Sequence, residues 1–205
     1  MKMTTVSALA LAIGFTAFAG AANAQTIDNN QRNNTNIRAQ LNATISDVTG
    51  DVSATSAAIA NSFTAEGSNL ATLNNYQNFW GDSRSGLTAT ITGVTGDVSA
   101  TSAAIANSAS MNVDFATAIN NTQLSGYDPS AALNSTIVTV VGDVSQTSAA
   151  LSNSASIESE FGRVASTQIN MAAVNADMST TVRNVRGAVT ATAAAIGNSL
   201  TVTGF

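Results

Sequence analysis

Three carboxylates recur at a fixed spacing and are the first residues to consider for chemistry. Asp51, Asp97 and Asp143 lie 46 residues apart, each directly after a glycine, and the next position in the series is Ala188. A column of carboxylates could hold calcium, which takes carboxylate and carbonyl oxygens. Aspartate is also common at turns because its side chain bonds to nearby backbone groups. No calcium-loop spacing is present, so we favour turns and predict no metal site.

The side chains on which most enzymes depend are missing from this sequence. It has no histidine and no cysteine, and its only lysine is Lys2. Without them there is no side-chain base that titrates near neutral pH, no thiolate nucleophile and no Ser–His pair. The ordinary zinc ligands are absent too. We therefore predict a protein that is not an enzyme, with no catalytic residues and no cofactor.

The aromatic residues that could bind a ligand gather in two short segments. The segments are "NYQNFWGDSRSG" at 75–86 and "LSGYDPS" at 124–130. Exposed aromatic rings could stack on a sugar or another surface, whereas buried rings would only pack the fold. Both alternatives stay open for the possible binding loop, which comprises Tyr76, Phe79, Trp80 and Tyr127.

The first 24 residues have the pattern of a secretory signal peptide. A short basic start precedes an apolar stretch from Val6 to Phe18, and Ala22-Asn23-Ala24 has the small residues of a cleavage site. No later stretch is long and apolar enough for a transmembrane helix. We expect a bacterial protein that is exported from Gln25 onward and is secreted or held at the cell surface.

The exported part is acidic and carries few charges. Six arginines face twelve acidic residues, which gives a net charge of 6 − 12 = −6 once Lys2 is removed with the signal peptide. Nucleic-acid binding needs a basic surface that neutralises phosphates. We therefore predict no nucleic-acid partner. Because the chain has no cysteine, its stability must come from packing and hydrogen bonds.

An internal repeat organises the whole exported part. The fifteen residues "VTGDVSATSAAIANS" occur at 48–62 and again at 94–108. The same register continues with spacings of 46, 46 and 45 through Ile45, Ile91, Ile137 and Val182. We predict a single repeat domain over residues 25–205, with copies at about 27–72, 73–118, 119–163 and 164–205.

Two secondary structures compete for each copy. Leu41, Ile45, Val48 and Val52 step by four, three and four, a heptad pattern that is typical of helices. The residue types favour strands, because Ser, Thr, Val and Asn form helices poorly. Over 103–115, the large apolar residues Ile105, Met111, Val113 and Phe115 all fall on alternate positions, which is the period of a strand. We favour an all-β fold, a β-solenoid of four 46-residue repeats, with two coils of about 23 residues or three of about 15 per repeat. α-Helical or coiled-coil repeats remain the alternative.

Two sets of amides recur with the repeat. In a solenoid, identical side chains of successive copies stack, and amide side chains can then bond to their own copies in ladders. Such an amide could instead satisfy a bend within its own copy. The predicted structural ladder comprises Asn61, Asn107, Asn153 and Asn198, together with Gln31, Gln77, Gln123 and Gln168.

The exported chain resembles secreted bacterial repeat proteins of the curlin type, the subunits of extracellular amyloid fibres. Both are exported chains of imperfect repeats rich in Ser, Asn, Gln, Ala and Gly. The residues after Gln31 and Gln77 depart from the curlin pattern, so no curlin residue is carried over. The resemblance implies a functional amyloid in which strand–turn–strand coils assemble into fibres.

Three functions fit these features. The first is a self-assembling subunit of an extracellular fibre or adhesin, for surface attachment or a biofilm matrix, which adds to itself end to end or to a sister subunit. An open solenoid end would offer unpaired strand edges to the next chain. The second is a monomeric cell-surface module that binds polysaccharide. The third, which requires the heptad pattern to be the true period, is a helical envelope spacer.

Overall fold

The computed structural model describes residues 6–10, 14–18 and 25–204, and all regular elements among them are β-strands. The all-β prediction is confirmed, and the helical alternative is wrong for the described residues. The strands are β1 (Val6–Ala10), β2 (Gly14–Phe18), β3 (Gln25–Asn33), β4 (Ile37–Val48), β5 (Val52–Gly67), β6 (Leu70–Phe79), β7 (Ser83–Val94), β8 (Val98–Ser125), β9 (Pro129–Val140), β10 (Val144–Asn170), β11 (Asn175–Val185) and β12 (Val189–Thr203).

The strands form two parallel sheets, neither of which is closed. The larger sheet has the order β1-β5-β8-β10-β12. In the same sheet β2 pairs with β5, β6 pairs with β8, and β3 pairs with β6. The smaller sheet has the order β11-β9-β7-β4. Apart from β1 and β2, neighbouring strands in each sheet come from successive copies, so the sheets extend in the direction in which the copies follow one another.

Each copy forms one layer, and equivalent residues of successive layers are direct strand partners. Leu41 pairs with Leu87, Leu87 with Leu133, and Leu133 with Met178. The prediction of two or three coils per repeat is wrong, because residue i pairs with residue i+46, or with i+45 in the fourth copy, and not with a residue of its own copy. Both sheets keep this register apart from local shifts, such as the one between Phe161 and Arg163, so most strand residues lie next to their equivalents in the following layer.

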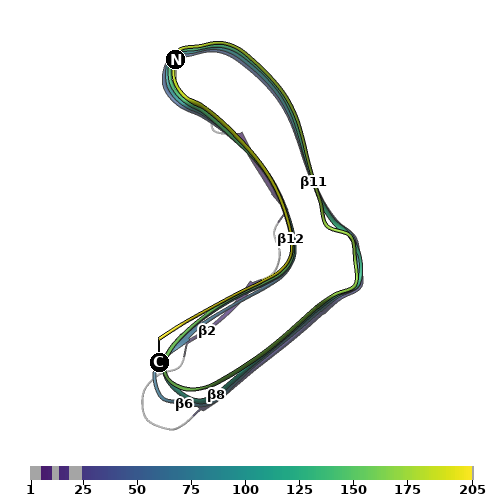
Figure 1. Ribbon diagram of the computed structural model, residues 1–205, viewed down its shortest axis with the longest axis vertical. Helices are drawn as coiled ribbons and strands as arrows, with labels where there is room; N and C mark the ends of the chain where they lie inside the picture. The colour runs from purple at the N-terminus through teal and green to yellow at the C-terminus, as the bar shows by residue number, and fades with distance from the viewer. Residues whose placement is uncertain (1–5, 11–13, 19–24, 205) are drawn as a thin grey trace.

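Seen along the stack, the layers superimpose on one crescent-shaped outline (Figure 1). β12 follows the concave side of the crescent and β11 follows part of the convex side. Within a layer, the chain runs along the convex side in β7, turns at Thr95-Gly96-Asp97 and returns in β8. This turn is the Thr-Gly-Asp corner that the sequence indicates.

Apolar side chains fill the interior in two main clusters. One joins the smaller sheet to the first halves of β5, β8 and β10, with Leu87, Ile91 and Val98 fully buried. The other lies in the second arm of the crescent, where Leu73 and Ile119 pack near Met111. The alternating burial of β8 and β9 explains the period-two pattern, since successive residues of a strand point to opposite faces.

Small residues bring the two sides of the crescent together between these clusters. Ser85 donates from its Oγ to the Ser56 carbonyl at 2.8 Å, and Ser102 Oγ donates to Ser85 Oγ at 2.9 Å. Ser83 Oγ likewise donates to the Ala58 carbonyl at 2.9 Å. These hydroxyls are buried, and their short side chains let one strand bond directly to the backbone of the opposite strand. The alanine- and serine-rich repeat is suited to this close approach.

The predicted signal peptide is described only in part. β1 and β2 pair in parallel with β5, from Val6 beside Ala54 to Phe18 beside Glu66. The predicted cleavage site at Ala22-Asn23-Ala24 lies outside the described residues. Among the residues that the structure describes, no helix is long and apolar enough to cross a membrane.

Candidate functional site: polar columns, an aromatic corner and the stack ends

The asparagines of the predicted ladder form one continuous column, which is buried at Asn61, Asn107 and Asn153 and exposed at Asn198. Asn61 Nδ2 donates to Asn107 Oδ1, Asn107 Nδ2 to Asn153 Oδ1, and Asn153 Nδ2 to Asn198 Oδ1, each at 2.8 Å. Asn107 also donates to the Leu124 carbonyl at 2.8 Å. Each amide donates toward the following copy, so the column has a direction. Its last donor, Asn198 Nδ2, lies in the terminal layer, 3.3 Å from the Gln168 carbonyl.

The glutamine column runs in the opposite direction. Gln77 Nε2 donates to Gln31 Oε1 at 3.0 Å, Gln123 Nε2 to Gln77 Oε1 at 2.8 Å, and Gln168 Nε2 to Gln123 Oε1 at 2.7 Å. Each glutamine also donates across the interior to a backbone carbonyl of its own copy, as Gln123 does to Ser154 at 2.8 Å. The column therefore joins successive layers and also joins the two sides of each layer.

The repeated aspartates bind backbone amides at one corner of the crescent. Asp51 Oδ1 accepts from the Asp97 amide at 2.9 Å, Asp97 Oδ1 from the Asp143 amide at 2.8 Å, and Asp143 Oδ1 from the Ala188 amide at 2.8 Å. The described residues contain no group of three or more His, Cys, Asp or Glu side chains placed to hold a metal. These carboxylates therefore join the corners of successive layers.

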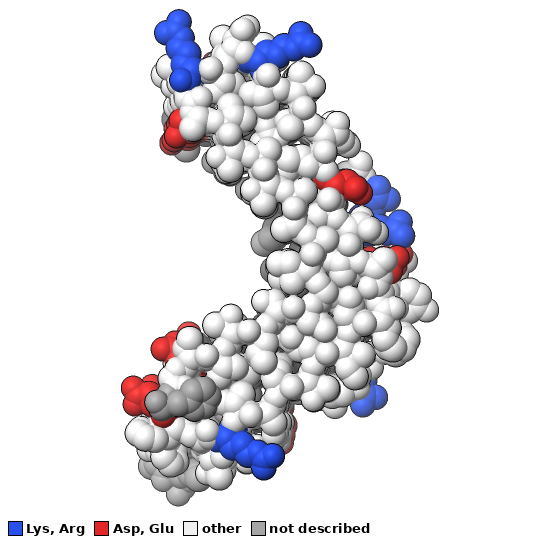
Figure 2. Space-filling model, in the orientation of Figure 1, with Lys and Arg blue, Asp and Glu red and all other residues white. Residues whose placement is uncertain are grey.

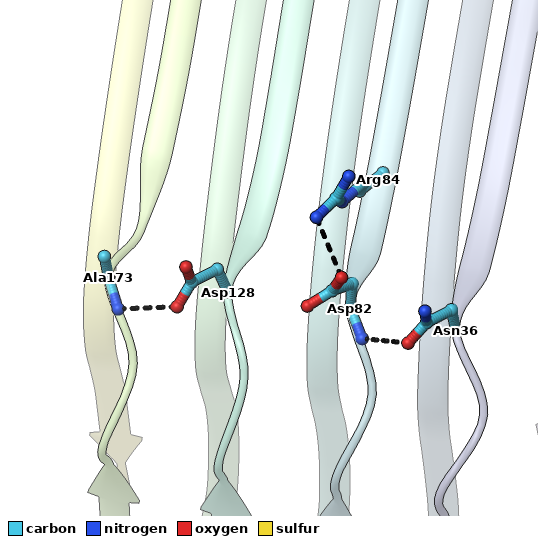
Figure 3. A network of polar contacts seen from close by, with 5 residues as sticks. All are labelled: Asn36, Asp82, Arg84, Asp128 and Ala173. Carbon is cyan, nitrogen blue, oxygen red and sulfur yellow. Dashed lines mark hydrogen bonds and ion pairs between the residues drawn. The ribbon is translucent and has the colours of Figure 1, made fainter.

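At a second corner, different residues form the same kind of bond, from a backbone amide to a side-chain oxygen of the preceding layer. Figure 3 shows the Asp82 amide donating to Asn36 Oδ1, at 2.8 Å, and the Ala173 amide donating to Asp128 Oδ1, at 3.0 Å. Asp82 also forms an ion pair with Arg84 at 2.8 Å. Sequence reasoning missed this corner, because its residue types change from copy to copy. In the fourth copy both corners carry alanine, Ala173 and Ala188, in place of a side-chain acceptor.

The aromatic residues of the possible binding loop divide into three environments. Phe79 is fully buried with Ala60 and Ala106, so it is a core residue and not a ligand contact, which corrects its assignment to the loop. Tyr76 is half-buried, and the Arg32 guanidinium lies 5.5 Å from its ring centroid. Trp80 and Tyr127 are exposed and lie together at the second corner.

Trp80 and Tyr127 form an edge-to-face pair across two layers, with ring centroids 6.1 Å apart and planes inclined by 74°. Trp80 belongs to the second copy and lies over Gly126 of the third. A Cβ on Gly126 would be 2.6 Å from Trp80 Cε3, so only glycine leaves room for the ring. The structure thus brings together two residues that are 47 apart in the sequence.

The last layer leaves unusual apolar surface at its end of the stack. Val189 is 49% exposed, whereas the equivalent Val144 in the preceding layer is 1% exposed. Leu200 is 47% exposed, and the equivalent Ala155 is buried. These positions point inward in every copy, and in the fourth copy no layer of the described residues covers them. Figure 2 shows that charged side chains are few and scattered on the face of the molecule in view.

Stacked parallel layers joined by columns of amides and carboxylates define an all-β repeat protein. A family model described as "HfaD: Holdfast attachment protein D" matches residues 65–205. Because the match covers more than half of the chain, the chain belongs to this family. It is therefore a surface-attachment protein with a cell-surface or extracellular location. The match does not confirm the resemblance to curlins. No curated protein and no solved structure matches the chain.

Proposed function

We propose that the layers form a β-solenoid whose chains add end to end into a fibre that attaches the cell to a surface. The partner in this assembly is a second copy of the same chain. The terminal layer of one chain, with β11 and β12, would pair with the first layer of the next, with β4 and β5. The single observation that carries the proposal is the exposure of inward-pointing Val189, whose equivalents in the three preceding copies are all buried.

The directions of the two amide columns support a head-to-tail joint. At the terminal layer, Asn198 offers a donor and Gln168 offers the acceptor Oε1. At the first layer, Asn61 offers the acceptor Oδ1 and Gln31 offers a donor. Both columns can therefore continue from one chain into the next without turning an amide over. Burial of the half-exposed Val189 and Leu200 would add roughly 1 kcal/mol each.

The strand edge that such a joint needs is occupied in the full chain. β1 and β2 pair with β5 from Val6 to Phe18, where a preceding chain would place its β12. These residues lie within the predicted signal peptide, so its removal on export would open the edge of β5. An unpaired strand edge is a template for pairing with another chain. Assembly would then follow export and not precede it.

The proposal is tested with the chain that starts at Gln25. We expect filaments in electron micrographs of the unaltered chain, and far fewer filaments after deletion of residues 188–205. Val189→Asp should have the same effect, because stacking would bury its carboxylate without a partner. Thr190→Asp is the matched control: the neighbouring side chain is exposed and points outward, so this variant should still form filaments. Equal filament yields from the chains with Val189→Asp and Thr190→Asp would contradict the joint.

A further inference from the structure

We propose that the outer face of the smaller sheet carries a binding site for a phosphate monoester, a tetrahedral group that is largely dianionic at neutral pH. The site is a shallow hollow over β4, β7 and β9, with a volume of about 280 Å³. Arg38 and Arg84 border it, and Gly86 lines its floor. Because all three strands belong to one chain and the site is on their outer face, it is separate from the joint between chains.

Gly86 is the residue that most clearly indicates a ligand. It pairs in unbroken register with Gln40 and Ala132, its φ is not positive, and an added Cβ would meet no atom within 4 Å. A turn, a bulge and a close backbone contact therefore do not explain it, in contrast to Gly96, which faces the backbone of the preceding layer. Glycine inside a strand weakens the strand, and it often marks a place where a ligand comes close. The close approach of a ligand is the explanation that remains.

Two arginines at the border of the hollow supply the positive charge that an anion needs. Arg38 and Arg84 are exposed and are direct partners on adjacent strands, which lie about 4.8 Å apart. Like charges directly opposite each other destabilise a sheet. The chain has only seven basic residues, and the equivalents in the third and fourth copies are Ser130 and Asn175. An anion bound between the two guanidiniums would remove their repulsion.

The two guanidiniums are held by different acceptors. Arg84 Nη2 donates to Asp82 Oδ2 at 2.8 Å and so forms an ion pair (Figure 3). Arg38 Nη2 donates to the neutral Gln40 Oε1 at 2.9 Å, because the first copy has Asn36 in the place of Asp82. Gln40 is the strand partner of Gly86, so this bond holds the Arg38 guanidinium beside the hollow with its charge uncompensated. Most of the five N–H groups on each guanidinium have no partner among the described residues.

The arrangement favours a tetrahedral anion over a carboxylate. A single guanidinium fork binds both oxygens of a carboxylate, whereas a phosphate monoester has a third terminal oxygen and can bridge two forks on adjacent strands. Thr88, Ser130 and Asn134 border the rest of the hollow, and their hydroxyl and amide groups suit the polar organic part of an ester. The volume is close to the lower limit of small-ligand pockets, roughly 300 Å³, so the organic part should be as small as glycerol.

Calorimetry on the full chain tests the site with glycerol 3-phosphate as the probe. We expect saturable binding that is at least about tenfold tighter than that of acetate, which can occupy only one fork. Arg38→Ala should weaken the binding of glycerol 3-phosphate about tenfold, because one of the two forks is lost. Arg183→Ala is the matched control: it removes the same charge from an exposed position on β11, outside the hollow, and should bind like the unaltered chain.

Gly86→Val tests the hollow separately from the charges. Valine leaves both arginines in place and suits a strand, but its side chain fills the floor of the hollow. We expect this variant to lose the binding of glycerol 3-phosphate with no fall in its thermal unfolding temperature. Thr90→Val is the matched control, because Thr90 is exposed on the same strand and lies outside the hollow. It should retain the binding of the unaltered chain.

The same phosphate group occurs in soluble esters and in the head group of phosphatidic acid, and vesicles distinguish these sources. Flotation with phosphatidic acid vesicles, but not with phosphatidylcholine vesicles, that glycerol 3-phosphate reverses would assign the site to a lipid head group. Binding of glycerol 3-phosphate without such flotation would assign it to a soluble ester.

Three results would overturn the proposal: no saturable binding of glycerol 3-phosphate, equal affinity for acetate, or equal effects of Arg38→Ala and Arg183→Ala. Full binding by the chain with Gly86→Val would overturn it as well. The chain with Val189→Asp should bind glycerol 3-phosphate as tightly as the unaltered chain, because Val189 lies in the fourth copy, outside the hollow. Failure of the joint between chains and failure of this site are therefore distinguishable.

Discussion

At the scale of single residues, buried amides hold the layers in register. Asn107 accepts one hydrogen bond from Asn61 and donates others to Asn153 and to the Leu124 carbonyl, all in the interior. A buried polar group without a partner is costly, so each amide requires the equivalent amide in the next layer. A shift of one residue between layers would move every such side chain to the opposite face. The columns therefore select a single stacking register.

Asn107→Ala should be among the more destabilising single changes in the chain. It removes one amide but leaves a donor on Asn61 and an acceptor on Asn153 without partners in the interior. We expect the free energy of unfolding to fall by about 2–3 kcal/mol, as measured by urea denaturation. Asn198→Ala, at the exposed end of the same column, should cost less than about 1 kcal/mol. Equal losses for the two variants would show that the column does not act through burial.

The parity of the strands explains which aromatic residue was misassigned from the sequence. Phe79 has the same parity as Leu73, Asn75 and Gln77, all of which are buried. Trp80 follows the last residue of β6 and stands at the corner, where alternation ends. The alternation was readable in the sequence and could have placed Phe79 inside. The approach of Trp80 to Tyr127 could not be read in this way, because it depends on the position of an unrepeated corner.

At the scale of elements, the corners determine how far apart the layers can be. At the first corner, which is Thr-Gly-Asp in the first two copies and Val-Gly-Asp in the third, each glycine faces the glycine carbonyl and the aspartate side chain of the preceding layer. A Cβ on Gly142 would lie 2.4 Å from Asp97 Oδ1 and 2.5 Å from the Gly96 carbonyl oxygen. Glycine is required here by this close approach. The repeat of glycine therefore follows from stacking, and the neighbouring aspartate binds the amide that stacking brings within reach.

Gly142→Ala tests whether the corner sets the spacing. We expect the free energy of unfolding to fall by about 1–3 kcal/mol, because the methyl group must push two layers apart. Gly86→Ala is the matched control within a strand, where an added Cβ meets nothing within 4 Å. That variant should be neutral or more stable by about 0.5–1 kcal/mol. Thermal unfolding followed by circular dichroism distinguishes the two, and a stable Gly142→Ala chain would contradict the role of the corner.

The length of a layer is the part of the fold that the sequence left undetermined. Strand alternation and a 46-residue period are compatible with three layers of about 15 residues, two of about 23 or one of 46 in each repeat. The deciding features are the other corners of each layer, such as those at Trp80 and Phe115, where only single residues repeat (Asp82 with Asp128, Phe115 with Phe161) and no motif is shared by all four copies. The interior columns were accessible from the sequence because their residues do repeat, from Gln31 to Gln168 and from Asn61 to Asn198.

At the scale of the whole molecule, the stack has two unlike ends and a chemically uniform middle. Inside the chain, each junction between copies has two amide columns and corner carboxylates that bind amides of the next layer. A junction between chains would keep the amide columns but lose the corner bonds, because Ala173 and Ala188 replace the acceptors. We therefore expect fibres to separate between chains before the layers of a chain separate. The family match to a holdfast attachment protein places this stack in surface attachment.

Cross-linking across the joint tests end-to-end stacking most directly. The chain has no cysteine, so an introduced pair reports only on its own position. Ser53, Ser99, Ser145 and Thr190 form one exposed column, and continued stacking would put Thr190 beside Ser53 of the next chain. Adjacent strands lie about 4.8 Å apart, within disulfide range. Within one chain the two positions are three layers, or about 14 Å, apart and cannot be bridged.

The measurement is oxidation of the chain from Gln25 that carries Ser53→Cys and Thr190→Cys, followed by a non-reducing gel. End-to-end stacking in register gives a ladder of covalent multimers that collapses on reduction. The register control carries Thr192→Cys in place of Thr190→Cys, which moves the thiol two residues along the strand, and it should give little or no ladder. A monomer from the first pair, or equal ladders from both, would contradict the continuation of the stack from chain to chain.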